Sequence, residues 1–168
     1  VSAFALIHNA AELAEPAALR DTDPAALSRA LRVSLEAPLV LTAAVLDATR
    51  HWRMPRRVLN ISSGLGRFAL AGAAGYCAAK AGMDHFTRAL ALEEADVANG
   101  ARVVSLAPGV IDTDMQVQLR GADAQRFPNR ARFEQMKAGG ALDSVDTAAA
   151  KVLALSLIHI SEPTRLRR

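Results

Sequence analysis

The chain of 168 residues is 51% hydrophobic and 22% charged, which predicts one soluble globular domain with its own core. We expect neither a membrane span nor a signal peptide, because no run of 18 apolar residues and no basic N-terminal stretch occurs, and the single cysteine excludes an internal disulfide framework and favours the cytoplasm. The net charge of +3 does not predict a nucleic-acid partner, because basic and acidic residues are interspersed until the last few positions.

The first predicted elements are a buried strand and a long helix. Phe4–His8 is a short apolar run that ends at Asn9-Ala10-Ala11. A helix is expected over 24–50, because Asp23 is a good N-cap and Pro24 a good first helical residue. Side chains at spacings of three and four predict its buried face, and Pro38 is expected to kink it. That face comprises Leu27, Leu31, Ser34, Pro38, Leu41, Val45 and Thr49.

Two more strands alternate with a second long helix. Residues 57–62 are predicted as a strand that runs into the loop 63–66, and residues 102–107 as a strand closed by Pro108-Gly109. Between them, 74–98 is predicted as a helix that stops at Asn99-Gly100. Because these strands are joined by long crossovers, the pattern predicts an α/β fold with a doubly wound parallel sheet and helices on both faces.

The last third of the chain carries weaker signals. Residues 112–140 are polar, arginine-rich and predicted as irregular apart from a short helix near 130–137, and 143–154 is predicted as a final helix. The arginines between Arg120 and Arg132 are expected to be mainly a solvated surface. No metal site is predicted, because the histidines lack the company of other ligands. Cys77 is expected to be a packing residue.

The strongest chemical signal is Tyr76-x-x-x-Lys80, with Ser63 thirteen residues before the tyrosine. Positions i and i+4 share a helix face, so the Lys80 ammonium is expected to lie near the phenol and to lower its pKa. Such a tyrosine can exchange a proton with a carbonyl or hydroxyl. Ser63 follows a strand at the edge where α/β sheets bind ligands, and its hydroxyl can donate to a substrate oxygen. Considered alone, Tyr76 and Lys80 are more often an ordinary exposed pair; Ser63 and Pro108-Gly109 in register favour catalysis.

Four motifs stand in the order and spacing of the short-chain dehydrogenase/reductases, which the chain resembles over residues 4–154: Asn9-Ala10-Ala11, Ser63, Tyr76-x-x-x-Lys80 and Pro108-Gly109-x-x-x-Thr113. The resemblance implies a Rossmann-like fold and an NAD(P)-dependent oxidoreductase that moves hydride between NAD(P)H and a carbonyl or alcohol. It also implies that Tyr76 is the catalytic acid/base, that Lys80 lowers its pKa and binds the nicotinamide ribose, and that Ser63 polarises the carbonyl.

The same resemblance implies the cofactor-binding residues: Asn9 and Ala10 beside the adenosine half, Pro108, Gly109 and Ile111 at the nicotinamide, and Thr113 at its amide or the diphosphate, together with Tyr76 and Lys80. Residues 112–115 and 127–130 resemble the sepiapterin reductase and benzil reductase branch, which implies a compact dicarbonyl or aromatic ketone and favours NADP over NAD. In this family 120–132 belongs to a lid over the substrate. The long helices 24–50 and 74–98 imply a homodimer or homotetramer.

One departure from the family lies in the first long helix. In Ser34-Leu-Glu-Ala-Pro38 a serine stands where the family has an asparagine that holds a water between the lysine and solvent. Ser34 is predicted to be buried, and it is equally a relay residue or a satisfied buried hydroxyl. This substitution supports an alternative function, a dinucleotide-binding homologue that regulates or scaffolds without catalysis.

A second departure concerns the two ends. The family's glycine-rich TGxxxGxG loop does not occur in the sequence. We therefore expect 1–154 to be the C-terminal part of one Rossmann-like domain whose N-terminal half is missing, and the chain as given to be inactive. Residues 155–165 match the translation of a DNA-sequencing adaptor, so 155–168 is expected to be a non-native tail.

Overall fold

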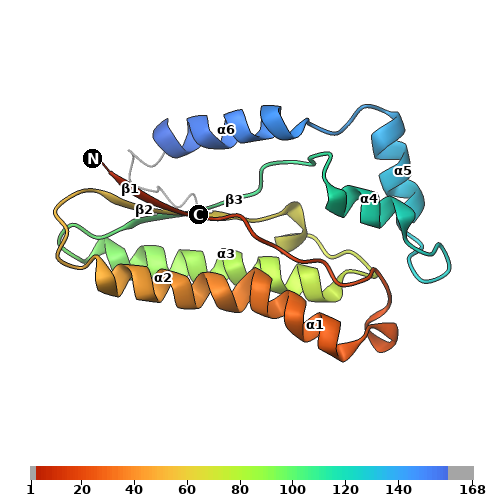
Figure 1. The fold of residues 1–168 in the computed structure, drawn as a ribbon, viewed down its shortest axis with the longest axis horizontal. Helices are drawn as coiled ribbons and strands as arrows, with labels where there is room; N and C mark the ends of the chain where they lie inside the picture. The colour runs from red at the N-terminus through yellow and green to blue at the C-terminus, as the bar shows by residue number, and fades with distance from the viewer. Residues whose placement is uncertain (1–2, 159–168) are drawn as a thin grey trace.

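Three parallel strands form the central sheet of the computed structural model, which describes residues 3–158 (Figure 1). The strands are β1 (Phe4–His8), β2 (Arg56–Ile61) and β3 (Arg102–Leu106), and they lie in the order β1-β2-β3. Leu6 pairs with Val58, which pairs with Val103 on its other side. The predicted strands and their parallel arrangement are confirmed within one residue at each end.

Helices cover both faces of this sheet, as predicted. One layer holds α1 (Pro24–Leu31), a π-helical turn η2 (Arg32–Glu36), α2 (Ala37–Ala48) and α3 (Ala74–Ala95), and α6 (Val145–Ile158) lies on the opposite side (Figure 1). The short helices α4 (Asp114–Gly121) and α5 (Arg130–Ala138) lie beyond the carboxyl end of β3. Two single 3₁₀ turns, η1 (Leu19–Asp21) and η3 (Gly64–Gly66), follow β1 and β2.

The start of the first long helix is the predicted one. The Asp23 carboxylate accepts the backbone N–H groups of Ala25 and Ala26 at 3.1 and 3.2 Å, and Pro24 occupies the first turn, where its missing N–H costs nothing. The helix then continues through η2 into α2 over the same face of the sheet. Pro38 therefore changes the hydrogen-bond pattern of the helix and does not end the helix.

The π-turn corrects one prediction about the buried face. In η2 the Ala37 N–H donates to the Arg32 carbonyl five residues back, and Pro38 has no N–H with which to resume the ordinary ladder. The extra residue in the turn rotates α2 about its axis, so Thr42 is 2% exposed and Leu41 is 52% exposed. The prediction that Leu41 faces the core is therefore wrong, while Ser34 is buried as expected.

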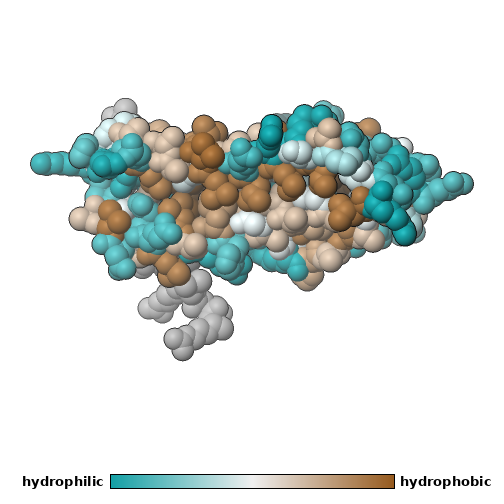
Figure 2. Space-filling model, turned by 90° about the horizontal axis from the view of Figure 1, so that it is seen from below, coloured by the Kyte–Doolittle hydropathy of each residue, from teal (hydrophilic) through white to brown (hydrophobic). Residues whose placement is uncertain are grey.

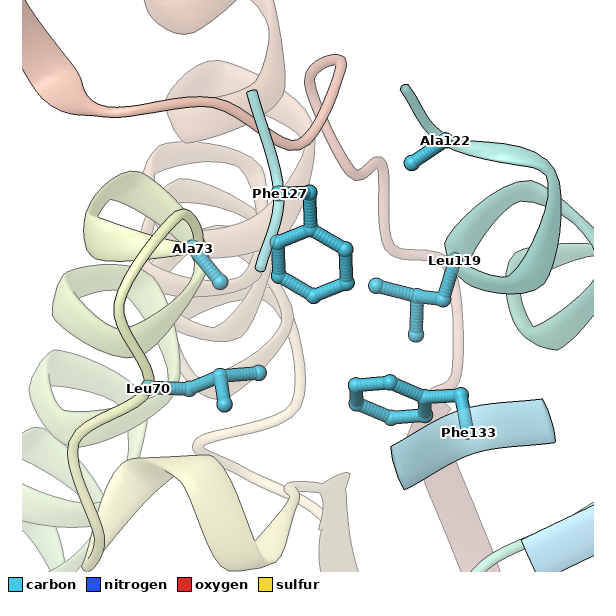
Figure 3. Packing of buried hydrophobic residues seen from close by; sticks show 6 residues of the cluster. All are labelled: Leu70, Ala73, Leu119, Ala122, Phe127 and Phe133. Carbon is cyan, nitrogen blue, oxygen red and sulfur yellow. The ribbon is translucent and has the colours of Figure 1, made fainter. Parts of the chain in front are cut away.

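Two apolar clusters make the core. One joins β2 and β3 to the long helices and centres on Val58, Ala101 and Val103. The other lies beyond the carboxyl ends of the strands, where α4, α5 and the segment before α3 converge (Figure 3). We call it the lid cluster; its buried members are Leu70, Ala73, Leu119, Ala122, Phe127 and Phe133.

The lid cluster explains a helix that the sequence did not predict. The expectation of a short helix near 130–137 is confirmed by α5, but 114–121, expected to be irregular, forms α4. Leu119 of α4 is buried against Phe127 and Phe133, which lie outside its own helix (Figure 3). Burial against distant residues, rather than a repeating apolar face, therefore stabilises α4.

Several lid arginines are paired rather than simply solvated. Arg126 donates to the Glu15 carboxylate at 3.0 Å and to the Asp21 carbonyl at 2.8 Å. These bonds connect the segment between α4 and α5 to the segment after β1. Arg120, 17% exposed, lies 3.3 Å from Asp112. These contacts replace part of the solvated surface expected for this region.

The C-terminal segment is only partly described. The final helix reaches Ile158, four residues past its predicted end, so 155–158 continue α6, whereas 159–168 lie outside the described residues. The interpretation of 155–168 as a non-native tail stays a prediction. Within the part of the chain that is described, none of the helices has the length and apolar character needed to cross a bilayer.

We predict that Phe127→Ala lowers the free energy of unfolding by about 3–5 kcal/mol, because a fully buried ring is lost from a packed site. Phe127 is 0% exposed, its ring centroid lies 5.8 Å from that of Phe133, and its edge fits against Gly72. Urea unfolding followed by circular dichroism measures the change. The control Phe68→Ala, at a side chain 72% exposed, should change stability by less than about 0.5 kcal/mol; equal losses would contradict the packing.

Candidate active site

Ser63 and Tyr76 are brought together by the turn after β2 and the first turn of α3. Ser63 is the N-cap of η3, where its hydroxyl accepts the Leu65 N–H at 3.2 Å. Its side chain also lies near enough to the Tyr76 hydroxyl to lower the pKa of that phenol. Two hydroxyl groups thirteen residues apart in sequence therefore meet at the carboxyl edge of the sheet, where a substrate oxygen could contact both.

Lys80 lies beneath this pair and is almost completely buried. Its Nζ donates to the carbonyl oxygen of Ile61, at the end of β2, at 2.7 Å and lies 5.7 Å from the centroid of the Tyr76 ring. The side chain is 2% exposed, and burial lowers the pKa of Lys80 to about 8, although the nearby Asp84 carboxylate acts in the opposite direction.

The pKa of Tyr76 is raised above its ordinary value, mainly because burial disfavours the phenolate. The Ser63 side chain lowers this pKa and the neighbouring Cys77 raises it, but neither outweighs burial. The sequence-based expectation that Lys80 lowers the tyrosine pKa is therefore wrong for the protein alone. Tyr76 is a neutral phenol at physiological pH, the form that can donate a proton.

The hydroxyl of Ser34 is bonded to the backbone both as donor and as acceptor. It accepts the Glu12 N–H at 2.9 Å and donates to the Glu12 carbonyl at 3.3 Å, and Ser34 is 1% exposed. Ser34 thereby fastens the π-turn to the segment that follows β1. Of the two interpretations that the sequence left open, a satisfied buried hydroxyl fits these contacts better than a relay residue.

The remaining predicted residues lie at the carboxyl ends of β1 and β3. Asn9 and Ala10 are exposed directly after β1. After β3, Pro108 and Ile111 are half-buried, and Gly109 is exposed with a φ of 94°, a conformation that favours glycine. Because the strands are parallel, these segments and Ser63 lie at one edge of the sheet.

Thr113 is the N-cap of α4, and its side chain makes no capping hydrogen bond. Its hydroxyl is thus uncommitted at a helix N-terminus, beside the Gly109 turn. Such a hydroxyl can bind an amide or a phosphate oxygen.

Three buried polar residues behind the site were missed at the sequence level. Asn60, at 0% exposure, donates to the Thr87 hydroxyl at 2.7 Å, and the buried Ser62 hydroxyl has no hydrogen-bond partner. Asp84 accepts a hydrogen bond from Ser105. The sequence did contain a signal for Asp84, which lies eight residues after Tyr76 on the same face of α3.

Apolar side chains flank the site, and the described residues form no cluster of metal ligands there. Tyr76 and Cys77 pack against the lid cluster, so one side of the phenol faces a hydrophobic surface. Among residues 3–158, no three His, Cys, Asp or Glu side chains gather where they could hold a metal ion.

Comparisons with known proteins point to one family. A family model described as short chain dehydrogenase matches residues 4–124. The chain is 36% identical over 149 residues to benzil reductase ((S)-benzoin forming) of Bacillus cereus, covering 89% of this chain and 60% of that protein. It is 35% identical over 153 residues to sepiapterin reductase of Mus musculus, covering 89% and 57%. The chain thus spans about three-fifths of the length of these relatives.

A solved structure gives the same result for the fold. The KRED1-Pglu enzyme superposes with a TM-score of 0.80 at 26% identity, and the match covers 92% of this chain and 62% of that one. The sheet and its helices are therefore arranged as in this solved enzyme structure.

We predict that Lys80→Met changes how stability depends on pH. The folded pKa of Lys80, about 8, lies below its ordinary value of 10.5, so between these values the unfolded chain binds more protons and the native chain gains stability as pH rises. Relative to the variant, the wild type should gain about 3 kcal/mol between pH 7.5 and 10.5.

Urea unfolding at several pH values measures this difference. Lys151→Met, at a side chain 58% exposed, serves as the control and should show little pH-dependent difference. A constant difference between wild type and Lys80→Met across the range would contradict the burial of the charge.

Proposed function

The chain belongs to the short-chain dehydrogenase family, and on that premise we propose that Ser63, Tyr76 and Lys80 catalyse hydride transfer between a nicotinamide dinucleotide and a carbonyl or alcohol substrate. The observation that carries this proposal is the proximity of the Ser63 side chain to the Tyr76 hydroxyl, next to the buried Lys80 ammonium. Because the chain spans about three-fifths of its relatives, the activity is proposed for a longer protein that contains it.

The three side chains have distinct tasks in this proposal. In reduction, the Ser63 hydroxyl donates to the substrate oxygen and orients it, and the Tyr76 hydroxyl transfers its proton to that oxygen. The cofactor supplies the hydride. The phenolate that remains is stabilised by the Ser63 hydroxyl, the group that lowers the pKa of Tyr76. In oxidation, the same proton moves in the opposite direction.

Residues at the sheet edge fit a nicotinamide dinucleotide. The uncommitted hydroxyl of Thr113 and the exposed backbone at Asn9, Ala10 and Gly109 leave polar groups free to bind it, beside Pro108 and Ile111. Lys80 would hold the ribose. We propose that residues outside this chain hold the pyrophosphate, that the chain alone is inactive, and that NADP is preferred to NAD.

The proposed substrate is a compact dicarbonyl or aromatic ketone, reduced in the cytoplasm. Its support is the apolar lid cluster (Figure 3), against which Tyr76 packs together with the partly buried Leu65 and Met115, so that the surroundings of the phenol are hydrophobic. The relatives named benzil reductase and sepiapterin reductase agree with this substrate class.

A non-catalytic dinucleotide-binding role is the second candidate. It is favoured by one observation, the commitment of the Ser34 hydroxyl to the Glu12 backbone, which leaves it less able to hold a water. Dinucleotide binding without turnover of any carbonyl in a broad panel would favour this role.

We also propose a homodimer or homotetramer built through α2 and α3. An apolar band crosses the face that these helices form (Figure 2). Among the exposed apolar side chains of these two helices, Val40 is 61%, Leu41 52% and Leu92 62% exposed. Side chains of this kind, gathered on two long helices, are typical of an interface between subunits.

We predict that Tyr76→Phe, in the longer protein, lowers kcat/KM by a factor of roughly 10²–10⁴, because the proton donor is lost while the ring is kept. NADPH and NADH oxidation with benzil and sepiapterin measures the rate. Dinucleotide binding, followed by fluorescence, should stay within about twofold as the control. Unchanged turnover in the variant would refute the proposed chemistry.

We predict that Val40→Glu combined with Leu92→Glu dissociates the oligomer, because two charges would be buried in an apolar interface. Light scattering measures the mass. Val117→Glu, on α4 and 57% exposed, is the matched control and should leave the mass unchanged. A monomeric wild type would contradict the proposed assembly.

A further inference from the structure

Asp84 extends the row formed by Tyr76 and Lys80 along α3, one helical turn farther on. It is 9% exposed and lies where α3 meets both β3 and the turn after β2. Its Oδ1 accepts the hydroxyl of Ser105 from β3. Its Oδ2 is buried and has no hydrogen-bond partner, with the Arg67 guanidinium 3.9 Å away.

A buried carboxylate with one unsatisfied oxygen is destabilising unless a charge compensates it. Arg67 is a weak compensator, because its side chain is 61% exposed. A second cation is Lys80, one turn away and 2% exposed. Besides these charges, Tyr76 faces the same region from α3, while β2 and β3 contribute the neutral Ile61 carbonyl and the Ser105 hydroxyl.

The turn that carries Ser63 packs directly on this part of α3. A Cβ at Gly66 would come within 2.8 Å of the Asp84 Oδ2 and 3.0 Å of the Lys80 carbonyl oxygen. Only a residue without a side chain allows so close an approach. Asp84 therefore contacts, through its two oxygens, both the strand that leads to Pro108 and the turn that begins at Ser63.

We propose that Asp84 is a positioning residue that holds Lys80 in its charged form and fixes the Ser63 turn against α3. This rests on the proposed function, because it assigns Asp84 a task toward two of the three catalytic side chains. The direction of the electrostatic effect agrees with the geometry: Asp84 raises the pKa of Lys80 and offsets part of the lowering by burial. Without it, more of Lys80 is neutral at physiological pH.

Lysine NMR tests the coupling without any turnover. The chain has three lysines, Lys80, Lys137 and Lys151, so ¹³C-labelled lysine gives three Cε signals that lysine-to-arginine variants assign. We expect Asp84→Asn to lower the titration midpoint of Lys80 by about 0.5–1 pH unit. Asp84→Glu, which keeps the charge, should restore most of the shift. An unchanged midpoint in Asp84→Asn overturns the proposal.

Two controls separate electrostatics from folding. Glu93→Gln, at an exposed carboxylate on the same helix, changes net charge equally and should leave the Lys80 midpoint in place. A second neutral variant, Asp84→Ser, removes the same charge with a smaller side chain and should lower the Lys80 midpoint as Asp84→Asn does. An unchanged midpoint in Asp84→Ser overturns the proposal even if Asp84→Asn fails to fold.

The pH profile of turnover distinguishes this proposal from the proposed function. In the longer protein, Asp84→Asn should move the alkaline limb of kcat/KM to lower pH, with a loss of about 3- to 10-fold near pH 8.5 and little loss near pH 6.5. A shifted Lys80 midpoint without turnover in the wild type would leave the coupling in place and refute the enzyme. Turnover that needs Tyr76, with an unshifted limb in Asp84→Asn, would refute the role of Asp84 alone.

Discussion

The buried ammonium of Lys80 is the interaction on which the rest of the site depends. A charge at 2% exposure requires partners, and it finds them in the Ile61 carbonyl, the Tyr76 ring and the field of Asp84. These contacts fix α3 against the end of β2. Once that contact is made, Ser63, which follows β2, lies next to the Tyr76 hydroxyl. The geometry proposed for catalysis thus follows from the burial of one charge.

A single proline affects both the buried and the exposed side of the first long helix. Pro38 accompanies the π-turn, which presents Ser34 to the Glu12 backbone and rotates α2 so that Thr42 faces inward. Thr42 then contacts His8 at 2.8 Å and secures the helix to β1. The same rotation leaves Leu41 52% exposed on α2. A local change in hydrogen bonding therefore shapes both the support of the site and the proposed subunit interface.

Sequence patterns predicted what is set locally and missed what is set by distant contacts. The strands, the start of α1 at Asp23 and the turn-by-turn placement of Tyr76 and Lys80 follow from short-range rules. The helix α4 did not, because its stability comes from Phe127 and Phe133. The raised pKa of Tyr76 did not follow from short-range rules either, because it is a consequence of tertiary burial. Asp84 was also missed, because its surroundings depend on Gly66 and Ser105, which approach it from other elements.

Burial acts in opposite directions on the two titrating groups, and this favours a particular order of proton transfers. It raises the pKa of the Tyr76 phenol and lowers that of the Lys80 ammonium to about 8, so Lys80 is the stronger acid. In the proposed reduction, a phenolate left after Tyr76 has given up its proton can therefore be reprotonated by Lys80 with a gain in free energy. The lysine would then recover its proton from solvent. On this view the burial of the two side chains favours this proton transfer, because desolvation makes Tyr76 the better base and Lys80 the better proton donor.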